Sequence, residues 1–109
     1  MSAALQHFQT MADCAAQMRE ASIAHDWDKL SALEHTLAAM RDTAKVTINP
    51  ARITDAAERE AILALLQQIL DDEAVIRSHA DPWMESTRKW LSQANRGKAM
   101  KNAYSRLDF

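Results

Sequence analysis

The sequence predicts an all-α protein: an antiparallel bundle of three main helices, the third of them long, followed by a short C-terminal docking helix. Two observations carry this prediction. The 109 residues include one glycine and two prolines, so few positions suit tight hairpin turns, and good helix formers such as Ala, Leu, Gln, Glu and Lys dominate. Apolar residues also recur at alternating steps of three and four, which is the spacing of a helix face in a bundle.

The first helix is expected from about Ser2, a suitable N-cap, to about His25. Asp26 can cap the second helix, and Asp28 lies in its first turn, where the helix dipole favours negative charge. The seam of the first helix consists of Ala4, Phe8, Met11, Ala15 and Met18.

The second helix is expected to end near Val46, because the run Thr47-Ile48-Asn49-Pro50 stops it. Trp27 precedes its seam by three residues and is predicted to anchor the start of this helix in the core. The seam consists of Leu30, Leu33, Leu37, Met40 and Ala44.

The third helix opens with Asp55-Ala56-Ala57-Glu58, which resembles a capping box, and is expected to continue to about Asn95. Two apolar rows run along it. The seam row is Ile62, Leu66, Ile69, Glu73, Ile76, Ala80, Trp83, Thr87, Trp90 and Ala94; the outer row is Leu63, Leu70, Arg77, Met84 and Leu91. Two shorter helices can cover only the first half of this face, so the half that carries Trp83 and Trp90 is left to the last helix or to a partner.

Pro82 interrupts the third helix, yet the seam passes through it without a change of register. We therefore favour a kink at Pro82 over a break. The alternative is a new helix that Asp81 caps, with Pro82 at its first position.

Gly97 marks the predicted start of the short last helix, which divides the chain into a core of residues 1–95 and a regulatory segment of residues 96–109. Its apolar face is Met100, Ala103, Tyr104 and Leu107; its polar face includes Lys98, Lys101, Asn102, Ser105 and Arg106. A helix of about ten residues is unstable alone in water. It must lie on its own domain or on a partner, either permanently or as a switch.

Charge and cysteine content narrow the class of protein. Residues 1–85 carry seven Lys/Arg against fourteen Asp/Glu, whereas residues 86–109 carry six against one. A basic tail suits an acidic protein surface, and no aromatic-basic interleaving supports nucleic acid. One cysteine, Cys14, excludes an internal disulfide framework, and no stretch approaches the ~18 apolar residues of a membrane span. We expect a soluble cytoplasmic protein without membrane or nucleic-acid binding.

A search for chemistry finds no enzyme motif. The four histidines lack the spacing of a helical metal site, and there is no glycine-rich phosphate loop or nucleophile elbow. Asp71-Asp72-Glu73 is interpreted as a solvated helix face rather than a paired-carboxylate site. We therefore predict no enzyme, no cofactor and no metal, and a function that depends on surfaces.

Three landmarks carry a family resemblance: Asp26-Trp27-Asp28 at the start of the second helix, Leu70-Asp71-Asp72-Glu73 in the third, and Asn102-Ala103-Tyr104-Ser105-Arg106-Leu107 after a basic linker. With their spacing, they resemble the FliT family of flagellar export chaperones over about residues 26–107. The final hexad is the most specific of the three. Pro82 and the end of the chain two residues after Leu107 depart from the family pattern.

The resemblance implies a cytoplasmic type III secretion chaperone that binds the filament cap protein FliD and prevents its premature assembly. It also implies contacts of the last helix with the flagellar export ATPase and, in some members, with the master regulator FlhDC. The expected partner-binding residues are Met100, Asn102, Ala103, Tyr104, Arg106 and Leu107.

A chaperone of this kind needs an exposed apolar stripe that covers a helix of the substrate. We expect Leu63, Leu66 and Leu70 to be the substrate anchors, with Arg77 as a polar contact at their edge. Leu66 is equally well explained as ordinary bundle core. Two other functions stay open: a structural coiled-coil homodimer built on the Trp83 and Trp90 half, and a transcriptional regulator that acts through protein or DNA contacts.

Overall fold

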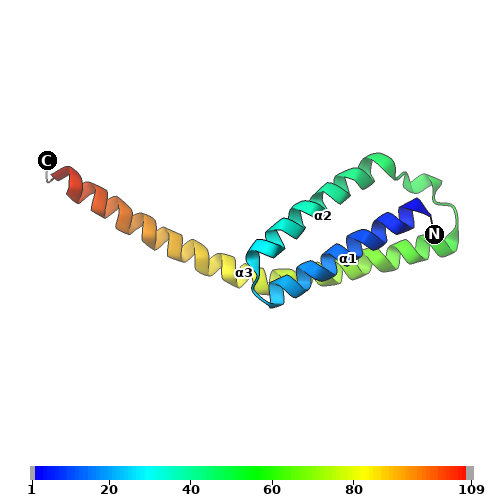
Figure 1. The fold of residues 1–109 in the computed structure, drawn as a ribbon, viewed down its shortest axis with the longest axis horizontal. Helices are drawn as coiled ribbons and strands as arrows, with labels where there is room; N and C mark the ends of the chain where they lie inside the picture. Colours follow the sequence, from blue (N-terminus) through cyan, green and yellow to red (C-terminus); the bar gives the residue numbers. More distant parts are fainter. Residues whose placement is uncertain (1, 108–109) are drawn as a thin grey trace. The chain divides into compact units, whose positions relative to one another are not determined.

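The structure, a computed structural model, describes the backbone of residues 2–107 and the side chains of residues 2–93. Its elements are α1 (Ala3–Ile23), α2 (Trp27–Thr47), the 3-10 helix η1 (Pro50–Arg52) and α3 (Ala56–Leu107). The chain divides into two compact units, residues 1–79 and 80–109. In the first unit, α1, α2 and the beginning of α3 lie side by side and alternate in direction (Figure 1). The prediction of an all-α antiparallel bundle is confirmed.

The helices begin where the capping residues predict. The Ser2 hydroxyl accepts a hydrogen bond from the backbone N–H of Leu5 at 3.1 Å. The Asp26 carboxylate likewise accepts from the N–H of Lys29 at 3.2 Å. Each cap satisfies a donor that a helix N-terminus otherwise leaves without a partner.

The turn between α1 and α2 reverses the chain without a glycine. The N–H of His25 donates to the carbonyl of Ser22, and the N–H of Asp26 donates to that of Ala21 at 2.9 Å. This pair of bonds is a Schellman motif, in which the residue after the C-cap takes a left-handed conformation. His25 has a φ of 57° and occupies that position, which histidine tolerates better than most residues. Its ring stacks on Trp27 with ring centroids 5.2 Å apart.

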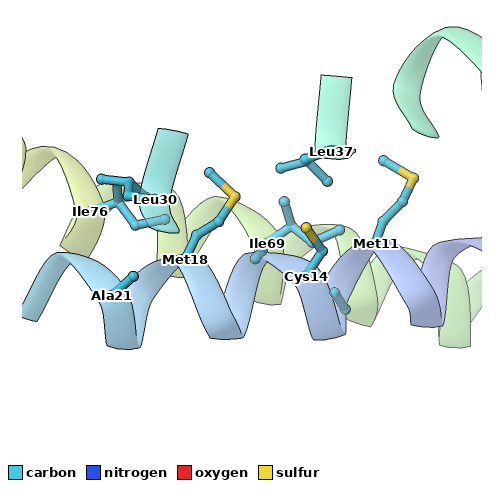
Figure 2. Packing of buried hydrophobic residues seen from close by; sticks show 10 residues of the cluster. Met11, Cys14, Met18, Ala21, Leu30, Leu37, Ile69 and Ile76 are labelled. Carbon is cyan, nitrogen blue, oxygen red and sulfur yellow. The ribbon is translucent and has the colours of Figure 1, made fainter. Parts of the chain in front are cut away.

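The core lies where the seams of the three helices meet (Figure 2). Met11 and Met18 from α1, Leu37 from α2 and Ile69 from α3 point into one layer of packed side chains. Phe8, Trp27, Leu33, Met40, Leu65 and Leu66 pack against this layer while remaining partly exposed. Trp27 thus contacts the core, as predicted, but is only half-buried.

Two ion pairs connect α3 to the two other helices. Arg19 in α1 lies 3.3 Å from the carboxylate of Asp72, and Arg41 in α2 lies 3.3 Å from that of Glu73. Asp72 is 5% exposed. The prediction of a solvated face at Asp71-Asp72-Glu73 is therefore wrong for Asp72, because successive residues of a helix point about 100° apart and can reach different neighbours.

The last part of α3 decides between the two interpretations of Pro82 and corrects the predicted end of the third helix. The helix passes through Pro82, so the alternative of a new helix that begins there is wrong. It also includes Gly97 and continues to Leu107. The segment after Gly97 is helical, as predicted, but it is the end of α3 rather than a separate short helix. The division into two compact units falls between His79 and Ala80. A functional division after Asn95, into a core and a regulatory segment, stays a prediction.

Candidate functional site

An apolar pocket of about 390 Å³ opens at the end of the bundle where α2 connects to α3. Its lining comes from α1, from the connection and from the first turns of α3. The residues are Phe8, Ile48, Pro50, Ile53, Arg59, Ile62, Leu63 and Leu66. The volume lies at the lower end of the range for ligand sites, about 300–1,000 Å³. A pocket with seven apolar residues and one cation suits an apolar side chain from a partner.

The connection owes its shape to local hydrogen bonds. The Asn49 side chain accepts from the N–H of Ala51 at 3.1 Å and caps η1, whose first residue is Pro50. The N–H of Ile53 then donates to the Pro50 carbonyl at 3.2 Å. This compact turn brings Ile48 and Ile53, which are five residues apart in sequence, to one pocket.

Leu63 and Leu66 are the two predicted substrate anchors that line this pocket. Leu63 is 63% exposed, so most of its side chain on the pocket wall is accessible. Leu66 is partly buried and also packs against the core cluster. Leu63 is therefore available to a partner, whereas Leu66 both supports the bundle and forms part of the pocket wall.

The two other predicted site residues lie elsewhere. Leu70 is 56% exposed and is not part of the pocket lining. Arg77 lines a separate hollow of about 270 Å³ between α2 and α3, together with Met18, Leu30, Glu34, Arg41, Glu73 and Ile76. The sequence pattern placed Leu63, Leu70 and Arg77 on one row of α3, but the structure does not join all four predicted residues in one pocket.

Sequence reasoning missed the contribution of the connection. Ile48 and Ile53 flank Pro50, and we interpreted this stretch only as a helix stop. The available signal was the presence of two isoleucines in a connection of eight residues, 48–55. Solvated loops are rich in Gly, Pro, Asn, Asp and Ser, so apolar side chains in a connection indicate that it packs against the fold.

In the second unit, the described residues 80–93 carry a further apolar set on one side of a single helix. Trp83 and Met84 are each 42% exposed, Leu91 is 47% exposed and Trp90 is 65% exposed. Large exposed apolar side chains that follow one helix face are typical of interaction surfaces. The predicted partner-binding residues Met100, Asn102, Ala103, Tyr104, Arg106 and Leu107 lie in α3, but their side chains are outside the described residues.

Burial raises the pKa of the Cys14 thiol, which lies in the core with its Sγ 3.5 Å from the Leu33 carbonyl oxygen. This desolvation makes the thiol a poor nucleophile. Among the described residues, no three His, Cys, Asp or Glu side chains are grouped in a way that could hold a metal ion.

Comparison with protein families decides the classification. The family described as flagellar protein FliT matches residues 5–106. The chain belongs to the FliT family. No match was found among curated proteins or among solved structures.

Membership of the FliT family fixes the broad role of the chain as that of a flagellar chaperone, in a family of chaperones rather than enzymes. The match begins within α1 and ends one residue before the end of α3, so it includes the pocket at the α2–α3 connection. Among the helices that the structure describes, none combines the length and the apolar character needed to cross a membrane.

Proposed function

We propose that the chain is an export chaperone for the flagellar cap protein FliD and that it binds an amphipathic segment of this protein at the α2–α3 pocket. One observation carries the proposal. The pocket is apolar and open, and Leu63 on its wall is 63% exposed in a protein of a flagellar chaperone family. A helix that lies along α3 from this pocket would also reach Leu70, because residues seven apart lie on nearly the same side of a helix.

Covering such a segment prevents premature assembly for a simple reason. Subunits that polymerise through amphipathic helices must expose an apolar face before they assemble, and this face aggregates unless another surface buries it. A groove that binds the same face competes directly with self-association.

The end of α3 is the proposed regulatory element. Residues 96–107 combine apolar and basic side chains, and residues 1–85 are acidic overall, with fourteen Asp/Glu against seven Lys/Arg. We propose that α3 opens at Gly97, where glycine weakens the propensity for helix, and that the released segment competes with the substrate for the apolar surface of the bundle. Met100, Asn102, Ala103, Tyr104, Arg106 and Leu107 would, when released, contact the export ATPase or the regulator FlhDC.

The exposed face of residues 83–91 supports a second candidate function, self-association of the chain as a homodimer. Its apolar side chains repeat at steps of seven, from Trp83 to Trp90 and from Met84 to Leu91, which suits a helical seam. A dimer whose association does not depend on residues 96–109 would favour this function over the regulatory role of the tail.

Calorimetric titration with a peptide from the C-terminal segment of the cap protein tests the proposed function. Leu63→Ala should weaken binding by about tenfold or more, since a central apolar anchor contributes about 2 kcal/mol. Ile23→Ala is the matched control, because Ile23 is 51% exposed at the C-terminal end of α1 and does not line the pocket. Equal binding by both variants and the unmodified chain would contradict the pocket assignment.

A further inference from the structure

Arg59 is the one charged residue in the lining of the apolar pocket. It belongs to the first turn of α3, and its Nε donates a hydrogen bond to the Ile53 carbonyl at 2.5 Å. A guanidinium has five N–H donors, so this bond leaves the four donors on the Nη atoms available. Within the described residues, the ion pairs are Arg19–Asp72, Arg41–Glu73 and Lys89–Glu85, and Arg59 takes part in none of them.

The acidic residues nearest to Arg59 in sequence are Asp55, Glu58 and Glu60. Glu60 is exposed and does not line the apolar pocket. Glu58 accepts a hydrogen bond from the Ser2 hydroxyl and lines two hollows beside the start of α1. Asp55 lines one of these hollows, together with Leu5 and Ala61. Neither carboxylate is part of the apolar pocket. The lining of the pocket thus holds one positively charged residue, Arg59, and no acidic residue.

We propose that Arg59 is a specificity-determining residue, which selects substrate segments that carry a carboxylate beside the apolar side chain that enters the pocket. This inference rests on the proposed function and adds the chemistry of the segment that is bound. The substrate is an amphipathic helix with an Asp or Glu three or four residues from its apolar anchor, since that spacing places both side chains on one face.

Three physical features favour recognition of a carboxylate. The planar guanidinium can donate two parallel hydrogen bonds to it, which gives geometric selectivity as well as attraction. Arg59 is exposed in the free chain, and an apolar side chain that enters the pocket beside it removes part of the surrounding water, so the pair is screened less than a fully exposed ion pair. The hydrogen bond from Nε to Ile53 holds the guanidinium in place before binding, which reduces the entropy lost on association.

A purely structural role for Arg59 predicts a different outcome. The same hydrogen bond to Ile53 ties the connection to α3, so a variant could weaken binding by loosening the pocket. A structural defect would weaken the binding of all peptides equally. A selective contact would remove the effect of one particular carboxylate, and a double-mutant cycle separates the two cases.

The experiment is a calorimetric titration of the full chain with the cap-protein peptide and with derivatives in which each Asp or Glu is changed in turn to Asn or Gln. Arg59→Gln should weaken binding by about fivefold or more. For the unmodified chain, one neutralised peptide should bind about fivefold more weakly than the parent peptide. For Arg59→Gln, this neutralised peptide and the parent peptide should bind equally well. Arg52→Gln is the control, because Arg52 lies on the neighbouring hollow and not on the pocket, and it should change affinity by less than about twofold.

Each outcome has a definite meaning. Unchanged binding by Arg59→Gln, or equal weakening with every peptide, overturns the role of Arg59 and leaves the proposed function intact. An unmodified chain that binds none of the peptides overturns both proposals. If Arg59→Gln fails to fold, the peptide series on the unmodified chain decides. The inference is overturned if no Asp or Glu of the peptide can be neutralised with a loss of affinity. It is supported if one such carboxylate lies three or four residues from an apolar residue of the peptide whose replacement by Ala also abolishes binding.

Discussion

The two stretches of α3, residues 56–79 and 80–93, have the same apolar periodicity but different surroundings. Ile62, Ile69 and Ile76 in the first stretch are between 6% and 8% exposed, whereas Trp90 in the second occupies the same register and is 65% exposed. The physical reason is length. At 1.5 Å per residue, the 21 residues of α1 or α2 can cover about 30 Å of a neighbour, and α3 has 52 residues. The periodicity shows which face of a helix is apolar, but not what covers it.

The largest expected difference between the two stretches concerns stability. Ile69→Ala should lower the free energy of unfolding by about 2–5 kcal/mol, because it removes buried methyl groups and leaves a cavity in the core. Leu91→Ala, at an exposed position of the second stretch, should change it by less than about 0.5 kcal/mol. Urea unfolding of both variants measures the difference. A comparable loss in Leu91→Ala would show that the second stretch is covered by another surface in solution.

Two of the three tryptophans, Trp27 in α2 and Trp90 in α3, extend the comparison beyond α3. Trp27 packs against the core and stacks on His25, but it is half-buried. Its replacement by Ala should therefore cost about 2–3 kcal/mol, less than the 3–5 kcal/mol of a fully buried aromatic residue. Trp90→Ala should leave the urea midpoint nearly unchanged. Equal losses of stability in the two variants would contradict the expectation that Trp27 contributes more to the core than Trp90 does.

Breaking an ion pair should also cost more stability in the first stretch of α3 than in the second. Arg19→Ala leaves the buried Asp72 carboxylate without its partner, and we expect a loss of about 1–2 kcal/mol, reduced because Arg19 itself is half-exposed. Lys89→Ala breaks a pair with Glu85 in which both side chains are exposed, so its effect should be close to zero. Thermal unfolding in low and high salt checks both values. Recovery of stability in the double variant Arg19→Ala, Asp72→Asn would identify the unpaired charge as the cause.

Removal of the end of α3 tests whether this segment regulates substrate binding by the bundle. Truncation after Asn95 should raise affinity for the cap-protein peptide by about fivefold, because the proposed competitor is absent. Calorimetric titration of the two forms measures this ratio. Equal or weaker binding by the truncated form would contradict the proposed competition. It would not bear on the description of the fold.

Tyr104→Ala refines the same test. If Tyr104 contacts the export ATPase or the regulator, this variant keeps the substrate affinity of the full chain and loses partner binding. If Tyr104 instead holds the tail on the bundle, the variant binds the substrate more tightly, as the truncated form does, and retains its other partner. The two roles of Tyr104 thus differ in the sign of a measurable change.

The smallest expected effect is a pH dependence that the core imposes through Cys14. Burial raises the pKa of this thiol above its usual value of 9.0, so the folded chain binds the proton more tightly than the unfolded chain. The resulting stabilisation is complete below pH 9 and is lost as the pH rises through the folded-state pKa. Unfolding free energies between pH 8 and pH 10.5 should fall more steeply for the unmodified chain than for Cys14→Ala. Parallel curves would show that the thiol is solvated.

The first half of the molecule could be predicted well from local signals. Ser2 and Asp26 were identified as caps from side-chain chemistry alone, since a short polar side chain before an apolar seam satisfies the first free N–H groups of a helix. The seams that contain Met11, Leu37 and Ile69 followed from periodicity, because a bundle must bury one face of each helix. The break predicted at Gly97 was wrong: glycine lowers helix propensity by about 1 kcal/mol, which a long helix can tolerate.

The sequence by itself determined the helical class, the order and caps of the helices and their apolar faces, since each of these depends on neighbours within one or two turns. Only the tertiary structure decided which apolar residues are covered. Ile48 and Ile53 meet Phe8 in one pocket, because this relation depends on where three separate helices and their connection pack. The position of Arg59 in that apolar wall has the same origin: a charge pattern along the chain does not show which residues a fold brings together in space.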